Sequence, residues 1–152
     1  MVIIECPALS LVGVSTRTKN ADEMDAATAK IVPLWQRFYQ DIYPEHLSGD
    51  VVYGVYCHYQ SDASGEFDVI AAVKEQGNEN TQRSSVFEKV ELAAGRYRVF
   101  SGQMGEGNPV FQLWQQVWEY FEQSDCAYRR HWGTDYEVYY PDGKIELFIG
   151  IA

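Results

Sequence analysis

The sequence Tyr136–Ile151, YEVYYPDGKIELFIGI, is typical of two β-strands joined by a tight turn. Asp142-Gly143 in its middle favours a two-residue hairpin loop, and with that loop Glu137 pairs with Phe148. Because side chains alternate between the two faces of a strand, this register predicts one apolar face and one face that combines carboxylates with aromatic rings. The predicted apolar face holds Tyr136, Val138, Tyr140, Ile145, Leu147 and Ile149, and the predicted mixed face holds Asp135, Glu137, Tyr139, Glu146, Phe148 and Gly150.

The composition indicates one acidic domain. Its 152 residues are enough for a hydrophobic core, and 46% of them are hydrophobic and 22% charged, as in ordinary globular proteins. The net charge of −10 argues against direct nucleic-acid binding, which depends on clustered Lys and Arg, and favours cations as partners. No apolar run approaches the roughly 20 residues of a membrane span, and the N-terminus lacks the basic region of a signal peptide. We therefore expect a cytoplasmic protein without a membrane partner.

Cysteines and histidines are few and widely spaced. Their spacing predicts neither a disulfide framework nor a metal site, and no Ser-His-Asp or Cys-His arrangement is apparent in the sequence. We expect no metal and no cofactor. The residues concerned are Cys6, Cys57, Cys126, His46, His58 and His131.

The first half of the chain has the pattern strand, helix, strand, strand. The strands are expected over Ala8–Thr16, Val51–Tyr59 and Phe67–Val73. The helix is expected from Asn20 to about Tyr39, with Asn20 and Glu23 as a capping box. Pro33 either kinks this helix or begins its second segment. A loop is expected over 42–50.

The second half repeats this plan after a polar, linker-like segment over 77–85. A strand is expected over Glu91–Gly102 and a helix over Val110–Phe121. Asn108 is expected to be the N-cap of this helix and Pro109 its first residue. The hairpin then closes the chain.

The two halves can be aligned, which predicts a tandem duplication. Leu-Trp-Gln recurs at Trp35 and Trp114, and the triplet GVY at Gly54 matches EVY at Glu137. We therefore predict an α+β fold, in which two strand-helix-strand-strand units form a curved antiparallel sheet with two main helices and a pseudo-twofold axis. The domain spans 1–152, with repeats of about 1–76 and 84–152. Because Glu137 replaces Gly54, a single site is expected near the axis on the side of the second half.

Several motifs of the second half resemble those of the GyrI-like small-molecule-binding domain. They are Gly95 with Tyr97, Trp114, Tyr136–Tyr139 and Ile145–Ile149. That domain is also the effector-binding part of AraC- and MerR-type multidrug-sensing regulators such as Rob and BmrR. Since no helix-turn-helix accompanies it here, we expect a stand-alone module, similar to the cationic-drug-binding domains carried on mobile integron cassettes.

The resemblance implies an aromatic pocket with a buried carboxylate that receives lipophilic cations. The carboxylate falls on Glu137, and an ionised carboxylate in an apolar site is stable only if it is hydrogen-bonded or paired with a cation. A cation at about 4 Å gains roughly 4 kcal/mol of raw attraction at an effective dielectric near 20, and each aromatic face adds roughly 0.5–2 kcal/mol. The candidate ligand-binding residues are Glu137, Tyr139, Glu146, Phe148, Trp114, Trp118, Trp35 and Tyr56.

Alternative readings remain at this point. Glu137 could be an ordinary exposed strand residue, and Trp114 and Trp118 could be core residues. Some GyrI-like proteins hydrolyse cyclopropane-containing electrophiles, which would use Glu137 or Glu146 to activate water. The founding member of the family suggests a protein-binding inhibitor instead. A binding module could also report to a DNA-binding regulator in trans.

Overall fold

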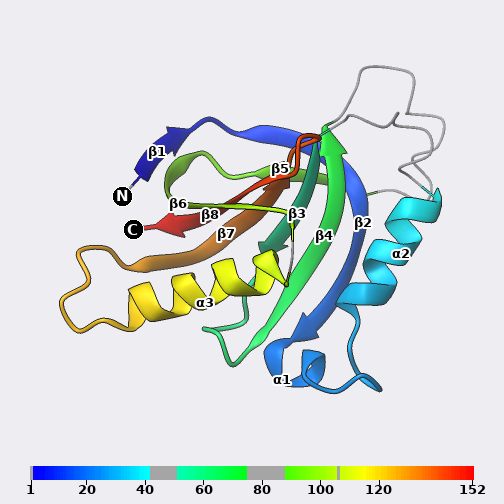
Figure 1. Ribbon diagram of the computed structural model, residues 1–152, viewed down its shortest axis with the longest axis horizontal. Coiled ribbons are helices and arrows are strands. Elements are labelled where there is room, and N and C mark those ends of the chain that lie inside the picture. The colour runs from blue at the N-terminus through cyan, green and yellow to red at the C-terminus, as the bar shows by residue number, and fades with distance from the viewer. Residues whose placement is uncertain (1, 42–50, 75–87, 106) are drawn as a thin grey trace.

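Eight antiparallel strands form one curved sheet in the computed structural model, which describes residues 2–41, 51–74, 88–105 and 107–152 (Figure 1). The strands are β1 (Val2–Cys6), β2 (Leu9–Lys19), β3 (Val52–Cys57), β4 (Glu66–Lys74), β5 (Glu88–Leu92), β6 (Gly95–Gln103), β7 (Arg130–Tyr139) and β8 (Lys144–Ile151). The helices are α1 (Asn20–Glu23), α2 (Ile31–Asp41) and α3 (Pro109–Glu122). The predicted α+β fold with a curved antiparallel sheet is confirmed.

The strand order, β1-β6-β8-β7-β3-β4-β2-β5, is symmetric about the pair β3 and β7. Exchanging the two halves of the chain converts this order into its own reverse, as a twofold duplication requires. Each half also carries an edge strand that the sequence pattern did not indicate: β1 pairs with β6 of the other half, and β5 with β2. The expected single strand over Glu91–Gly102 is wrong, because β5 ends at Leu92 and β6 begins at Gly95. The repeat boundaries remain a prediction.

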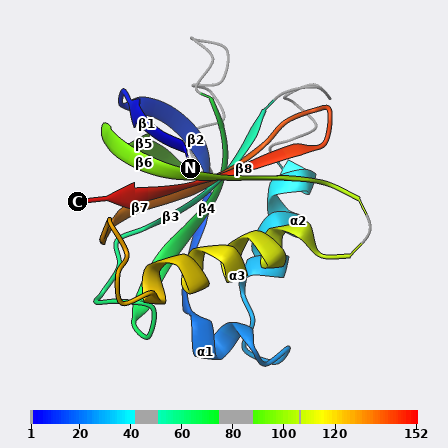
Figure 2. The same cartoon turned by 60° about the vertical axis from the view of Figure 1, so that its left-hand side comes forward.

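The helices cover one face of the sheet, which we call the helix face (Figure 2). Leu34 and Phe38 of α2 are buried with residues of β2, β3 and β4. Leu113 and Val117 of α3 are buried with residues of β6 and β8. The opposite face carries its own core cluster, which includes Tyr136. The sheet is therefore buried on both sides, and the helices stand at equivalent places in the two halves.

The prediction of one continuous helix from Asn20 to about Tyr39 is wrong. The alternative, in which Pro33 lies near the start of a second helical segment, is correct. α1 ends at Glu23 and α2 begins at Ile31, so Pro33 lies in the first turn of a separate helix, where a missing N–H is tolerated. Asn20 caps nothing, and Glu23 instead accepts hydrogen bonds from the backbone N–H groups of Lys30 (2.8 Å) and Ile31 (3.1 Å). Glu23 thus caps α2 across the connection.

The start of α3 agrees with the prediction. Asn108 is the N-cap, and its side-chain oxygen accepts a hydrogen bond from the backbone N–H of Phe111 at 3.2 Å. Pro109 is the first helical residue. The expected loop over 42–50 and the expected linker over 77–85 lie outside the described residues.

The hairpin between β7 and β8 has a three-residue loop, so the predicted two-residue loop is wrong. The backbone N–H of Tyr140 donates to the carbonyl of Lys144, and the N–H of Gly143 donates to the carbonyl of Tyr140, both at 3.0 Å. Pro141 follows Tyr140 in this turn, the position that proline favours. Gly143 has φ of 91°, which places a left-handed residue at the end of the turn, as in hairpins with a glycine bulge.

This loop shifts the register by one residue and moves every side chain of β8 to the other face relative to β7. Glu137 pairs with Leu147, not with Phe148. The alternation predicted within each strand is correct. The prediction is wrong only about which residues of β8 share a face with Glu137 of β7. The helix face of the hairpin holds Asp135, Glu137, Tyr139, Ile145, Leu147 and Ile149, and the opposite face holds Tyr136, Val138, Tyr140, Glu146, Phe148 and Gly150.

No helix within the described part of the chain is long and apolar enough to cross a membrane.

Candidate functional site

Glu137 lies at the centre of the sheet and is buried. It pairs with Gly54 across the β3–β7 contact, and only 1% of its surface is exposed. A Cβ atom at Gly54 would lie 2.7 Å from Oε1 of Glu137 and 3.1 Å from Cζ2 of Trp35. The two residues that the sequence alignment equates therefore face each other, and the glycine of the first half leaves the space that the carboxylate of the second half occupies.

Within the part of the chain that the structure describes, three side chains donate hydrogen bonds to this carboxylate. The hydroxyl of Tyr56 (2.9 Å) and the indole N–H of Trp114 (2.7 Å) bond to Oε2, and the hydroxyl of Tyr139 (2.7 Å) bonds to Oε1. The donors come from β3, α3 and β7, so both halves hold the charge. Multiple hydrogen bonds to an ionised carboxylate stabilise the charged form.

Burial and hydrogen bonding act on Glu137 in opposite directions. Burial raises the pKa of Glu137 above its ordinary value, and the hydrogen bonds from Trp114, Tyr139 and Tyr56 limit the rise. Burial and, next, the charge on Glu137 raise the pKa of Tyr56 and of Tyr139 well above the ordinary tyrosine value. Both hydroxyls therefore remain protonated donors at neutral pH.

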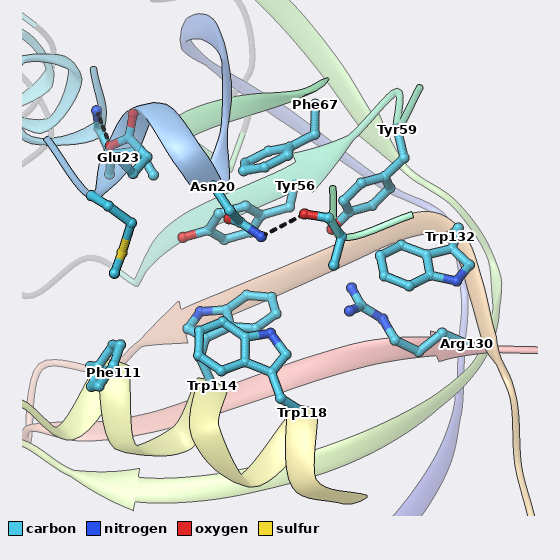
Figure 3. A pocket seen from close by; sticks show the side chains of 13 residues that line it. Asn20, Glu23, Tyr56, Tyr59, Phe67, Phe111, Trp114, Trp118, Arg130 and Trp132 are labelled. Carbon is cyan, nitrogen blue, oxygen red and sulfur yellow. Dashed lines mark hydrogen bonds between the residues drawn. The ribbon is translucent and has the colours of Figure 1, made fainter. Parts of the chain in front are cut away.

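A cavity of about 390 Å³ lies on the helix face beside this carboxylate (Figure 3). Tyr56 and Trp114 line it side by side, with their rings edge-on and the centroids 5.1 Å apart, and Trp118 follows Trp114 on α3. The residues that line it are Asn20, Glu23, Met24, Ile31, Tyr56, Tyr59, Ala63, Phe67, Phe111, Trp114, Trp118, Arg130 and Trp132. Its size suits a small organic molecule, and its lining is largely aromatic.

Glu137 does not line this cavity but lies directly behind its walls. Tyr56 and Trp114 present their rings to the cavity, while their polar atoms bond to the carboxylate. Tyr139 also lies behind the wall, and the ring of Trp35 packs edge-on against it at 5.7 Å. The candidate residues Glu137, Tyr139 and Trp35 therefore contact one another outside the lining of the cavity.

Glu146 and Phe148 lie on the opposite face of the sheet, so the structure does not bring them to the cavity. Glu146 accepts a hydrogen bond from the hydroxyl of Tyr140 at 2.6 Å. Phe148 stacks on Tyr136, with ring centroids 4.6 Å apart. The physical reason is the one-residue register shift. The same shift separates Glu146 from Glu137, so the two carboxylates do not form a pair.

A second buried acid, Asp135, lies beside the cavity; the sequence pattern placed it on the face of Glu137 but not among the candidate ligand-binding residues. Asp135 has no exposed surface. Its Oδ2 accepts hydrogen bonds from the hydroxyl of Tyr59 and from Nη2 of Arg130, both at 2.6 Å, and its Oδ1 accepts one from the N–H of Gly150 at 2.9 Å. The signal for this site was the spacing of Asp135 and Glu137, which places both acids on one face of β7.

Arg130 and Trp132 reach the cavity because β7 is irregular between Arg130 and Asp135. Trp132 has φ of 59°, which is rare for a bulky side chain and marks local strain. Its ring lies 3.7 Å from the guanidinium carbon of Arg130. Irregularities of this kind re-aim side chains, and sequence reasoning offers no signal for them.

The charges around the cavity are mainly negative. Glu23 lines it, Glu137 lies behind it, and the charge of Arg130 is paired with that of Asp135. Within the described residues, no group of three or more His, Cys, Asp and Glu side chains could hold a metal ion. The arrangement is suited to binding by charge and aromatic contact.

The fold and the aromatic cavity define a small-molecule-binding protein of the GyrI-like class. The chain belongs to the family of integron-associated effector binding proteins, whose family model, Cass2, matches residues 2–151. It is similar to the integron cassette protein VCH_CASS2 from the mobile metagenome of Vibrio cholerae, with 36% identity, a TM-score of 0.88, and coverage of 99% of this chain and 95% of the other. The predicted resemblance is confirmed.

More distant structures share the fold. The structure of SAV2435 bound to tetraphenylphosphonium matches with a TM-score of 0.71 at 20% identity, covering 99% of this chain and 93% of that chain. No curated protein matches the sequence significantly.

Proposed function

We propose that this protein binds amphipathic organic cations in the aromatic cavity, with Glu137 as the counter-charge behind its walls. The observation that carries the proposal is the position of the carboxylate. Two of its three donors, Tyr56 and Trp114, are also cavity walls. A cation on these rings therefore interacts with the aromatic faces and with the charge behind them.

The energies of these interactions are sufficient for binding. At a separation of roughly 6 Å, a cation and a carboxylate attract each other by about 3 kcal/mol at an effective dielectric near 20. Contact with each aromatic face contributes roughly 0.5–2 kcal/mol. Hydrogen bonding of a ring N–H or O–H to an anion also makes the ring more electron-rich, which strengthens its contact with a cation. None of these interactions is directional, so many amphipathic cations would fit.

The relatives support this choice of ligand. The family is described as effector-binding, and SAV2435, which has the same fold, was crystallised with the lipophilic cation tetraphenylphosphonium. In the hydrolase alternative, Glu146 lies on the opposite face of the sheet, which leaves Glu137 as the candidate residue to activate water. No observation favours the inhibitor reading, and a regulator acting in trans remains a prediction.

Charge selectivity tests the proposal. Tetraphenylphosphonium and tetraphenylborate have the same shape and opposite charges. We expect the phosphonium to bind at least tenfold more tightly by isothermal titration calorimetry, since even about 1.4 kcal/mol of charge preference gives that ratio. Equal affinities, or a preference for the borate, would show that the cavity is a purely apolar site or an anion site.

A further inference from the structure

Arg130 is a buried cation that uses one guanidinium nitrogen, Nη2, to pair with Asp135. Its side chain is 7% exposed, and its guanidinium points into the cavity (Figure 3). Nη2 forms the ion pair with Asp135 at 2.6 Å. Nε is buried and has no hydrogen-bond partner among the described residues. A guanidinium carries five N–H donors, and those at its tip point into the cavity, where the acceptor of a ligand can reach them.

The guanidinium is held rigidly where it is. One side of it lies on the ring of Trp132, at 3.7 Å from the centroid, and the ring of Trp114 is 6.0 Å away. The strained backbone of Trp132, with φ of 59°, maintains this stacking. Strain of this kind is typical of ligand-binding sites. Arg130 therefore presents fixed donors at one end of the cavity.

The charge balance indicates what these donors would bind. Asp135 already neutralises Arg130 and also accepts hydrogen bonds from Tyr59 and Gly150. Glu23 and Glu137 make the remaining environment negative, which disfavours an anionic group. An uncharged acceptor, such as a carbonyl or ether oxygen, satisfies the donors without adding charge.

We propose that the ligands of this protein carry an uncharged hydrogen-bond acceptor that bonds to Arg130 while their cationic end lies over Tyr56 and Trp114. This inference rests on the proposed cation binding and narrows it. The inference predicts that cations with a carbonyl or ether oxygen at the far end bind more tightly than purely hydrocarbon cations, which can contact only the aromatic walls.

Arg98 provides a matched control within the same chain. Its Nε is also buried and without a partner among the described residues. Its guanidinium carbon lies 4.1 Å from the ring of Phe100 and 4.9 Å from that of Tyr120. Arg98 is not among the residues that line the cavity, so its substitution changes a stacked arginine without changing the cavity wall.

The test uses two cations that differ in one atom group. They are 4-acetyl-N,N,N-trimethylanilinium and 4-isopropenyl-N,N,N-trimethylanilinium, in which a methylene replaces the carbonyl oxygen. We expect the full-length protein to bind the acetyl compound about tenfold more tightly, as a hydrogen bond to a charged donor implies. The ratio of the two affinities should be the same in Arg98→Lys. It should fall to about one in Arg130→Met/Asp135→Asn, a double variant that leaves neither partner of the ion pair buried alone.

Nuclear magnetic resonance of the arginine side chains gives a second readout that needs no variant. The acetyl compound should shift the Nη–H signals of Arg130, and the isopropenyl compound should leave them in place. Equal affinities of the two compounds for the wild-type protein, or no shift of the Arg130 signals, would overturn the inference while cation binding stands. Failure of both cations to bind would overturn cation binding as well.

Discussion

Gly54 and Glu137 are paired residues of β3 and β7, and the carboxylate of Glu137 occupies the place where a side chain of Gly54 would lie. They are also equivalent residues of the two halves. A twofold fold can hold only one bulky side chain at its axis, because both copies point into the same space. Loss of the side chain in one half is what allows a single buried charge.

Gly54→Ala tests this relationship. The added Cβ would lie 2.7 Å from the Glu137 carboxylate and 3.1 Å from Trp35, so we expect destabilisation of about 1–3 kcal/mol and weaker cation binding. Urea unfolding and calorimetry measure the two effects. Gly105→Ala is the control, because a Cβ there would meet no atom within 4 Å. Equal stability of the two variants would contradict the steric relationship.

The hydrogen bonds to Glu137 can be removed singly. Tyr56→Phe and Tyr139→Phe each delete one donor, and each should reduce the free energy of unfolding by about 1–2 kcal/mol. Each should also raise the pKa of Glu137, because the charged form loses a stabilising hydrogen bond. Carbon-13 NMR of the carboxyl group measures this pKa. An unchanged or lower pKa in both variants would show that the hydroxyls do not donate to the carboxylate.

Cation affinity should depend on pH in the acidic range. The pKa of Glu137 in the folded protein lies above its ordinary 4.5, so the carboxyl group takes up a proton as the pH falls through this raised value, and the counter-charge disappears. Affinity for tetraphenylphosphonium should therefore fall as the pH decreases through this raised pKa, at a pH higher than 4.5. Calorimetry across this range should show a much flatter profile for Glu137→Gln.

The raised pKa of Glu137 also makes the free energy of unfolding depend on pH. A carboxyl group whose pKa is raised on folding binds its proton more tightly in the folded state. Its favourable contribution is complete below the unfolded pKa and is lost as the pH rises through the folded pKa. The stability of the wild type relative to Glu137→Gln should therefore decrease from acidic to neutral pH in urea unfolding. An increase over that range would mean that the hydrogen bonds outweigh burial.

Substitution of Trp118 should mainly affect ligand binding, and substitution of Trp35 should mainly affect stability. Trp118 lines the cavity, whereas Trp35 packs behind it against Tyr139. Trp118→Leu should weaken tetraphenylphosphonium binding about three- to tenfold, as the loss of one aromatic contact implies, with little loss of stability. Trp35→Leu should mainly lower the unfolding temperature. The reverse pattern would place the ligand against Trp35 of α2 instead of Trp118 of α3.

The sequence predicted the features that follow from periodicity and internal similarity. The α+β fold, the equivalence of Gly54 with Glu137 and the N-cap at Asn108 belong to this group. The hairpin register predicted from Asp142-Gly143 was wrong, because the preceding Pro141 favours a turn that is one residue longer. That single residue decides whether Phe148 or Leu147 accompanies Glu137.

The candidate site was predicted only in part, because the sequence pattern reports local alternation and not backbone irregularities. Residues carried by β7 and α3 and the aligned Tyr56 lie in or behind the cavity walls, because alternation within one strand or one helix is a local property. Arg130 and Trp132 could not be predicted, because they reach the cavity through a backbone irregularity and a positive φ that leave no mark in the pattern of residue types. Asp135 was visible as a carboxylate on the face of Glu137, but its partner came from this irregular segment.

The most direct test is the affinity of tetraphenylphosphonium for Glu137→Gln. The substitution keeps the shape of the side chain and removes its charge, and Glu146→Gln makes the same change on the opposite face of the sheet. With circular dichroism verifying the fold of both variants, Glu137→Gln should bind at least tenfold more weakly than the wild type, and Glu146→Gln should bind like the wild type. Wild-type affinity in Glu137→Gln would contradict the role of the buried carboxylate as the counter-charge.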